Sequence, residues 1–200
     1  MIKIFPMEEE ILFLILNLKM WGFLHYMPGW RLTRPRSHHC LAVNGHSLVV
    51  AGGLSTSATV EMLQLDGTTW QGWQRLPDMQ PRTGHACTVT AVGGQAALVV
   101  AGGETGSLLL DSVDLLILEG RTGWTKLPAL LHPRAGHLLA SLPGGLLLVA
   151  SGHGPEDRLQ LGVEQLAVGA TNWSLAGPGL LSPRSQAAGT LVPSAFCPNT

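Results

Sequence analysis

Residues 81–103 read PRTGHACTVTAVGGQAALVVAGG, and this stretch decides the fold class of the chain. Its apolar run from Ala96 to Ala101 is short and lies between glycines. Runs of this length that are bounded by glycine predict strands that are buried on both faces of a sheet. The chain also contains 25 glycines and 13 prolines, which disfavour long helices and separate short strands.

The features of this stretch recur along the chain. Pro-Arg pairs begin at residues 35, 81, 133 and 183, at steps of 46, 52 and 50 residues. Each of the first three pairs is followed by a histidine, an apolar run closed by a small-residue doublet, a valine–acid pair and a tryptophan. Such a period indicates a repeat architecture. The repeated residues are Arg36, His39, Gly52, Gly53 and Trp73 in the first unit, Arg82, His85, Gly102, Gly103 and Trp124 in the second, Arg134, His137, Gly152 and Trp173 in the third, and Arg184 at the start of a fourth.

Each unit is predicted to form four short strands, at about residues 39–43, 47–51, 59–65 and 70–75 in the first unit. The doublet ends the second strand, where no side chain fits or where a positive φ is needed. The tryptophan of the fourth strand is predicted to be buried between neighbouring units, which must stack because one unit cannot bury its faces alone. Since the arginines and histidines occupy the same place in each unit, we expect them to serve the structure.

This order of features resembles the kelch repeat over residues 30–192. The resemblance implies an all-β fold, a kelch-type β-propeller in which each unit is one four-stranded blade. The chain departs from the family where Leu65, Leu118 and Val168 replace the usual tyrosine of the third strand, and where Ser151 replaces the first glycine of the last doublet.

Three units are complete, a fourth strand at residues 30–32 precedes them, and a first strand at residues 187–192 follows them. Propellers typically close with four to eight blades, so the chain is predicted to be an incomplete arc. It would be a fragment of a longer protein, a truncated product or one part of an assembly. The outer blade faces, at residues 30–60 and 150–192, would then be uncovered and apolar, and we expect self-association through these open blade faces.

The two ends of the chain lie outside the repeat. Residues 1–29 are predicted to be a degenerate partial blade or a non-native start, and residues 193–200 a C-terminal tail. A signal peptide or membrane span is disfavoured, because Glu8 to Glu10 precede a short apolar stretch that polar residues interrupt. We therefore expect a cytoplasmic protein. The alternative is a secreted or membrane-anchored protein, in which the Asn172-Trp173-Ser174 glycosylation sequon could be used.

The chain has three cysteines, Cys40, Cys87 and Cys197. An odd count without dense spacing does not indicate a disulfide framework. Free buried thiols in a reducing compartment are the favoured interpretation. The alternative is a single Cys40–Cys87 bridge, since both residues closely follow a Pro-Arg pair and could lie on neighbouring strands.

Composition and motifs argue against several classes of function. Only 12% of residues are charged, the 12 basic residues nearly balance the 13 acidic ones, and the Lys and Arg residues are scattered, so no nucleic-acid partner is expected. The sequence has no P-loop, no dinucleotide fingerprint and no zinc or hydrolase motif, so we predict no catalytic residue, no metal and no cofactor. Copper-oxidase enzymes of similar architecture rely on tyrosines, and Tyr26 is the single tyrosine of this chain.

Binding is predicted in the loops, because loops that vary on a constant scaffold carry function. In kelch-like blades the second-to-third and fourth-to-first connections emerge on one face. The partner would be another protein, and the resemblance implies a scaffold or a substrate-recognition domain, as in adaptors of ubiquitin-ligase-type complexes. The alternatives are a secreted or surface kelch-repeat protein and a truncated product without independent function. The candidate binding residues are Ser55, Ser57, Asp78, Glu104, His153, Glu156, Asp157 and Arg158.

Overall fold

The computed structural model describes residues 32–186, except residues 46, 55–57, 67–68, 121–122 and 183. This part of the chain contains strands, one 3-10 turn, η2 (Pro155–Asp157), and no α-helix, so the predicted all-β class is confirmed. None of its segments is a helix long and apolar enough to cross a membrane. The predicted first strand at residues 187–192 and the segments 1–29 and 193–200 lie outside the described residues.

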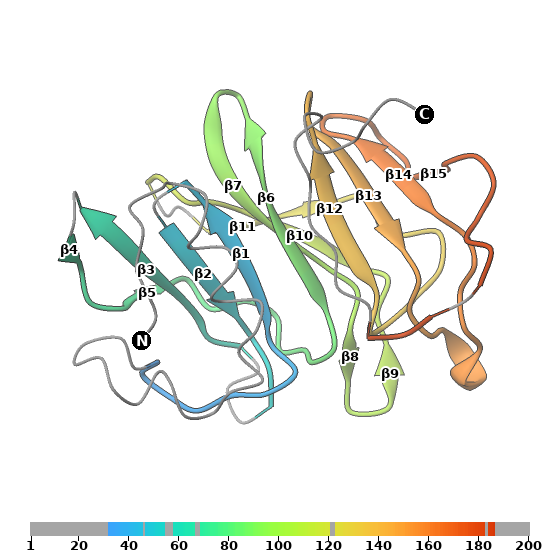
Figure 1. Ribbon diagram of the computed structural model, residues 1–200, viewed down its shortest axis with the longest axis horizontal. Helices are drawn as coiled ribbons and strands as arrows, with labels where there is room; N and C mark the ends of the chain where they lie inside the picture. Colours follow the sequence, from blue (N-terminus) through green and yellow to red (C-terminus); the bar gives the residue numbers. More distant parts are fainter. Residues whose placement is uncertain are drawn as a thin grey trace, which may run out of the picture.

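The chain folds into three antiparallel sheets that stand side by side in chain order (Figure 1). Sheet 1 contains β1 (Cys40–Asn44), β2 (Ser47–Ala51), β3 (Val60–Asp66), β4 (Thr69–Trp70) and β5 (Gln74–Leu76). Sheet 2 contains β6 (Ala86–Val92), β7 (Gln95–Ala101), β10 (Val113–Ile117) and β11 (Trp124–Leu127). Sheet 3 contains β12 (Leu138–Leu142), β13 (Leu146–Ala150), β14 (Glu164–Ala167) and β15 (Ser174–Leu175). A hairpin of β8 (Glu104–Thr105) and β9 (Leu108–Leu109) lies between β7 and β10 in the chain.

The fourth strand of the first unit differs from the prediction, because it is split into β4 and β5. Leu65 of β3 lies opposite Trp70 of β4, but Met62 of β3 lies opposite Gln74 of β5. Residues 71–73 therefore face only two residues of β3, which is the arrangement of a β-bulge. An extra residue of this kind leaves no periodic trace in the sequence.

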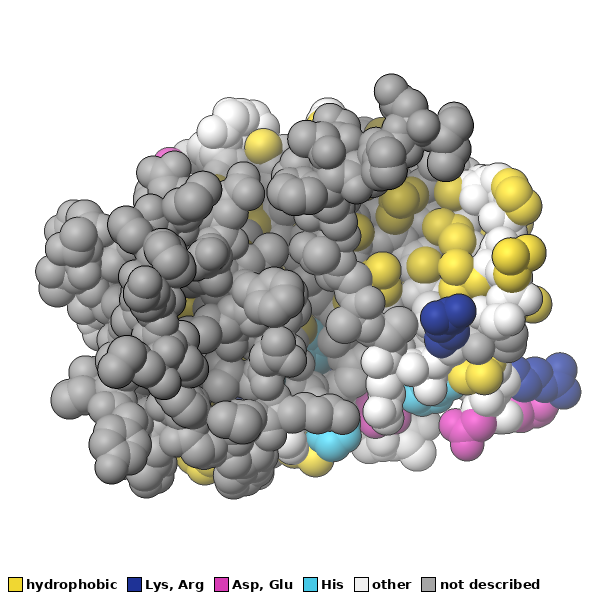
Figure 2. Space-filling model, in the orientation of Figure 1, with side chains coloured by type: hydrophobic (Ala, Val, Ile, Leu, Met, Phe, Trp, Pro, Cys, Tyr) yellow, Lys and Arg dark blue, Asp and Glu magenta, His cyan; other side chains and the backbone are white. Residues whose placement is uncertain are grey.

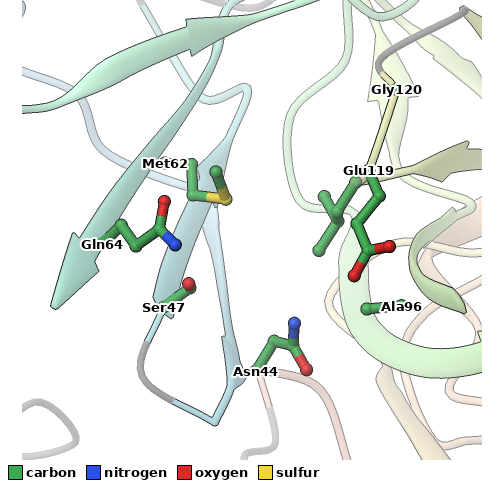
Figure 3. Close-up of a pocket in the computed structure, with 8 residues that line it drawn as sticks. Asn44, Ser47, Met62, Gln64, Ala96, Glu119 and Gly120 are labelled. Atoms are coloured by element: carbon green, nitrogen blue, oxygen red, sulfur yellow. The ribbon is translucent and has the colours of Figure 1, made fainter. Parts of the chain in front are cut away.

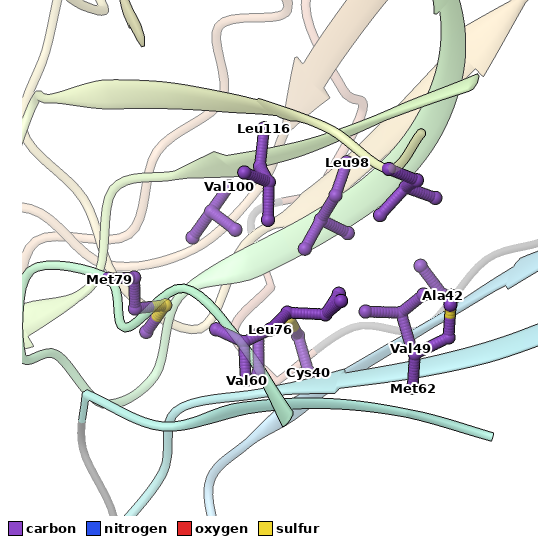
Figure 4. Close-up of a cluster of buried hydrophobic side chains, with 12 residues drawn as sticks. Cys40, Ala42, Val49, Val60, Met62, Leu76, Met79, Leu98, Val100 and Leu116 are labelled. Carbon is purple, nitrogen blue, oxygen red and sulfur yellow. The ribbon is translucent and has the colours of Figure 1, made fainter. Parts of the chain in front are cut away.

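Apolar side chains fill the space between consecutive sheets. One cluster lies between sheets 1 and 2 (Figure 4), and a second lies between sheets 2 and 3. The central strand β7 contributes Leu98 and Val100 to the first cluster and Ala97, Val99 and Ala101 to the second. Successive residues of a strand point to opposite faces, so a strand between two neighbouring sheets is apolar at every position. This arrangement explains the continuous apolar run from which the fold class was predicted.

The first strand of each sheet contacts the first strand of the next: β1 contacts β6, and β6 contacts β12 (Figure 1). A disulfide joins Cys40 of β1 to Cys87 of β6, with the two Cα atoms 5.7 Å apart. The Ser141 hydroxyl of β12 donates a hydrogen bond of 2.9 Å to Thr90 Oγ1 of β6. The expectation of free thiols is therefore wrong for these two cysteines, because the neighbouring strands bring them within bridging distance.

The tryptophans link each unit to the one before it. Trp124 Nε1 donates a hydrogen bond of 3.0 Å to the Pro77 carbonyl, and Trp173 Nε1 donates one of 2.8 Å to the Pro128 carbonyl. Trp173 is 3% exposed, but Trp124 is only half-buried, so the predicted burial of Trp124 is only partly met. Trp124 lies on the outermost strand of sheet 2, where part of its ring meets solvent.

The sequence predicted that both outer faces of the stack are uncovered, but the structure leaves only one of them partly open. On sheet 1, Leu48, Val50 and Leu63 point away from the cluster shared with sheet 2, and all three are buried. On sheet 3, Leu138 and Leu148 point away from sheet 2 and remain half-buried, on a face where hydrophobic side chains are visible at the surface (Figure 2). The prediction is therefore wrong for sheet 1. Burial of each of these three side chains is favoured over exposure by roughly 1.5–3 kcal/mol.

We predict that the Cys40–Cys87 bridge stabilises the contact between sheets 1 and 2. Its two cysteines are 47 residues apart in the chain, and native bridges of this kind typically stabilise proteins by about 2–4 kcal/mol. Cys87→Ser should lower the free energy of unfolding by about that amount in urea titrations without reductant. Cys197→Ser should leave it unchanged. If Cys87→Ser had the same effect in the presence and absence of reductant, the bridge would not be the cause.

Candidate functional site

Two kinds of connection between strands gather at one edge of the three sheets, opposite the tight hairpin turns such as that of β6 and β7 (Figure 1). The connections from the second to the third strand of each sheet leave there, and the β8–β9 hairpin and η2 belong to them. The connections from the last strand of one sheet to the first strand of the next return along the same edge. We call this surface the loop face. It comprises the described residues of segments 52–59, 77–85, 102–112, 128–137 and 151–163.

A buried arginine closes the base of each loop, and Arg82 is the clearest case. Its Nη1 donates hydrogen bonds to the carbonyls of Gly102 (3.1 Å) and Ser112 (3.2 Å), which begin and end the connection from β7 to β10. Its Nη2 pairs with Asp114 Oδ2 at 2.5 Å, and Lys126 Nζ reaches the other carboxylate oxygen at 2.8 Å. One guanidinium therefore holds both ends of the loop and the acid of the third strand.

The same arrangement recurs in the other two units. Arg36 Nη1 binds the carbonyls of Gly52 (3.2 Å) and Thr59 (3.0 Å), and its Nη2 pairs with Glu61. Arg134 Nη1 binds the carbonyls of Ser151 (3.0 Å) and Gly162 (3.4 Å), and its Nη2 pairs with Glu164 at 2.5 Å. Burial lowers the pKa of both arginines, and the paired carboxylates oppose that shift. Charge-assisted hydrogen bonds of this kind are about twice as strong as neutral ones.

The small-residue doublets sit where the loops leave the sheets and approach the next unit. Gly102 (φ 57°) and Gly103 (φ 92°) both have positive φ. A Cβ on Gly102 would lie 2.6 Å from both the Arg134 carbonyl oxygen and His137 Cε1, so no side chain fits. The Gly103 amide donates a hydrogen bond of 2.8 Å to the same Arg134 carbonyl. At the matching place in the third unit, Ser151 adopts φ 73°.

Two of the repeated histidines, His85 and His137, lie buried beneath these turns, whereas His39 is exposed. His85 Nε2 makes a hydrogen bond of 3.0 Å to the Ala51 carbonyl of the preceding unit. His137 is placed alike beside the Ala101 carbonyl, but neither of its ring nitrogens reaches a partner at hydrogen-bonding distance. Burial lowers the pKa of His85 to about 4 and that of His137 to about 3, so both rings are neutral at physiological pH.

A ladder of backbone hydrogen bonds joins the units near the loop face. The Gly84 amide donates to the His38 carbonyl (3.2 Å), the Gly136 amide to the Gly84 carbonyl (2.8 Å), and the Gln186 amide to the Gly136 carbonyl (2.7 Å). All four residues have φ between 53° and 62° and stand two positions after an arginine of the repeat. The ladder therefore fixes successive loops relative to one another.

The predicted binding residues are spread over this face. Ser55 and Ser57 lie outside the described residues. Glu104 lies in β8, and it accepts a hydrogen bond of 3.4 Å from Thr83 Oγ1. Two of the charged side chains form ion pairs on the surface, Asp78 with Arg75 (2.8 Å) and Glu156 with Arg158 (2.8 Å). Asp157 is exposed, and the backbone of His153 forms isolated β-bridges with Ala135 and Leu159. In the described part of the chain, no three His, Cys, Asp or Glu side chains come together as a metal site would require.

Exposed leucines on the loop face were not among the predicted residues. They contribute to every second-to-third connection and to one fourth-to-first connection. Single exposed apolar side chains are ordinary, but several on one face of a fixed scaffold are typical of an interaction surface. In the sequence, these residues could have been recognised as leucines that lie in loops, outside the apolar runs of the strands. The residues are Leu54 (49% exposed), Leu108 (63%), Leu131 (45%), Leu159 (44%) and Leu161 (46%).

A shallow cleft of about 400 Å³ lies between sheets 1 and 2, away from the loop face (Figure 3). Asn44, Ser47, Gln64 and Glu119 contribute polar groups to its rim, and apolar residues such as Met62 line it as well. The four polar side chains can donate and accept hydrogen bonds, but they do not include a nucleophile paired with a base. The cleft therefore offers hydrogen-bonding and apolar contacts to a ligand.

Comparison with known proteins supports the fold but does not identify the chain. No family model matches it. It is 32% identical over 151 residues, or 67% of its length, to adagio-like protein 2 of Oryza sativa subsp. japonica, of which it spans 23%. Among solved structures it is similar to YjhT, with a TM-score of 0.63 and 16% sequence identity, over 76% of this chain and 54% of YjhT. The chain thus corresponds to a part of each of these longer proteins.

We predict that acid weakens the fold through the two buried histidines. In the unfolded chain both protonate below their ordinary pKa of 6.5, whereas the folded protein resists protonation down to about pH 4 for His85 and about pH 3 for His137. Their contribution is therefore complete above pH 6.5 and is lost as the pH falls from 6.5 towards 4, by up to about 1.4 kcal/mol per pH unit for each histidine.

Urea titrations at pH 7, 6 and 5 measure this dependence. His137→Gln should reduce the slope of unfolding free energy against pH, and His38→Gln, at an exposed position, should not. A slope that His137→Gln leaves unchanged would rule out this origin of the acid sensitivity.

Proposed function

We propose that the chain forms three blades of a kelch-type β-propeller whose loop face binds another protein. The internal repeat, the three stacked four-stranded units and the backbone ladder support the propeller. In this proposal the ladder continues into further blades, which another part of a longer protein or an assembly would supply.

The exposed leucines of the loop face carry the binding part of this proposal. Leu108 begins β9, next to the turn of the β8–β9 hairpin, and Leu159 follows η2 in the next loop. Both loops are held at their base by a buried arginine, so the leucines stand on a fixed frame. Apolar side chains that are fixed before binding lose little conformational freedom on association, and this favours recognition.

A binding role, rather than catalysis, is the function that this surface supports best. Its charged side chains are paired with one another or stand singly, and its buried histidines face backbone carbonyls. By resemblance to the kelch repeat, a substrate-recognition role in a ubiquitin-ligase-type adaptor fits such a face.

The Cys40–Cys87 disulfide bears on where binding would take place. Disulfides persist in oxidising compartments and are rare in the cytosol. A bridge in protein isolated from its natural source would favour a secreted or surface role over the cytoplasmic one, and two free thiols at these positions would favour the cytoplasm.

Site-specific photo-cross-linking tests the binding surface. A photo-cross-linking phenylalanine derivative is placed at Leu108, at Leu159, or at Gln95, an exposed residue at the far end of β7. In cells that express the protein, we expect the same cross-linked partner from the two loop positions and none from Gln95. Equal cross-linking from all three positions, or none from the loops, would contradict a binding role for this face.

A further inference from the structure

Arg184 begins a fourth unit, and its backbone is docked as in the other units. Its carbonyl accepts hydrogen bonds from the Gly152 amide (2.7 Å) and from Ser151 Oγ (2.6 Å). The carbonyl of Arg134 accepts in the same way from the Gly103 amide (2.8 Å). Arg184 therefore occupies the place that the arginine of the repeat occupies in sheets 2 and 3.

The side chain of Arg184 differs from those of its three equivalents. The side chains of Arg36, Arg82 and Arg134 have no exposed area, and each pairs with a carboxylate. Arg184 is exposed, and no carboxylate of the described residues pairs with it. The guanidinium of Arg184 thus lacks a carboxylate partner among the described residues, whereas each of the three equivalent arginines has one.

A cavity of about 520 Å³ lies beside Arg184 on the outer face of sheet 3. Leu138, Ala150, Leu180 and Leu181 give it apolar walls. Figure 2 shows hydrophobic side chains gathered on this face of the molecule, next to a basic side chain. The site therefore combines one positive charge with an apolar surface.

The three complete units show what such an arginine binds. In each unit a single extended segment supplies a backbone carbonyl to Nη1 and, two residues later, a carboxylate to Nη2. The residue two positions after the acid is a leucine in every unit, and it is buried on the same side of the strand as the acid. The segments are Thr59-Val-Glu-Met-Leu63, Ser112-Val-Asp-Leu-Leu116 and Gly162-Val-Glu-Gln-Leu166.

We propose that Arg184 and this cavity form a docking site for an extended segment of a second protein. The segment has the pattern small residue, valine, acid, any residue, leucine. Its carbonyl and carboxylate bind the guanidinium, and its leucine packs against the apolar wall. The three segments of this pattern in the printed sequence each bind their own arginine, so the site is left for a fourth copy of the pattern, which the proposal assigns to a second polypeptide. The site is distinct from the leucines of the loop face and does not depend on their role.

A fluorescent peptide that copies Leu161–Val168 (LGVEQLAV) is the probe, and anisotropy against the full chain is the measurement. We expect saturable binding that Arg184→Ala weakens by about tenfold or more, since a buried charge-assisted hydrogen bond contributes at least that much. A peptide with glutamine in place of the glutamate should lose as much affinity, and the two peptides should bind Arg184→Ala alike. Arg34→Ala, at another exposed arginine, should not change the affinity.

The Arg184→Ala variant should fold normally, because the contacts of this residue with sheet 3 use its backbone carbonyl. The free energy of unfolding of the variant, measured in urea at several pH values, should equal that of the wild type. The absence of saturable binding to the wild-type chain at millimolar peptide would overturn the proposal. Binding that is indifferent to Arg184→Ala, or to the loss of the glutamate, would overturn it as well.

Discussion

The hydrogen bonds of one buried guanidinium hold each unit of this protein together. Arg82 binds the carbonyls at both ends of a loop and Asp114, the second residue of the third strand, so it ties the loop to the sheet at a single point. The connections that the three arginines close differ in length and sequence, yet the strands around them pair alike. A fixed base of this kind lets the loops vary without disturbing the sheets, and this is the property that a binding scaffold requires.

Two departures from the repeat, at Ser151 and Ala187, occur together. A side chain on Gly52 or Gly102 would meet the histidine of the following unit, at 2.6 Å from Cε1 in both cases. Ser151 stands at the same place in the third unit, and there the sequence has Ala187 where the next histidine would be. The hydroxyl of Ser151 binds the Arg184 carbonyl instead. The loss of the histidine thus accompanies the loss of the glycine that accommodates it.

Sequence periodicity predicted the all-β class because strands buried on both faces leave unbroken apolar runs, as β7 does. It also singled out the arginines and the valine–acid pairs, but it did not join them, because Arg82 and Asp114 are 32 residues apart. The bulge at residues 71–73 and the Cys40–Cys87 bridge depend on register and on contact between sheets, which have no local pattern. The exposed leucines of the loop face are of the same residue type as the buried leucines of the strands, so residue type alone does not separate the two groups.

Hydrogen exchange at the base of a loop tests the role of the buried guanidinium most directly. Arg82→Met leaves Asp114 buried without its partner, whereas Arg82→Met with Asp114→Leu removes both charges. In both variants the account predicts faster amide exchange in residues 102–112 than in the wild type. The double variant should keep the protection of β12 and β13, whereas the single variant should also lose about 3–5 kcal/mol of global stability. Unchanged exchange in residues 102–112 of both variants would show that the arginine does not hold the loop.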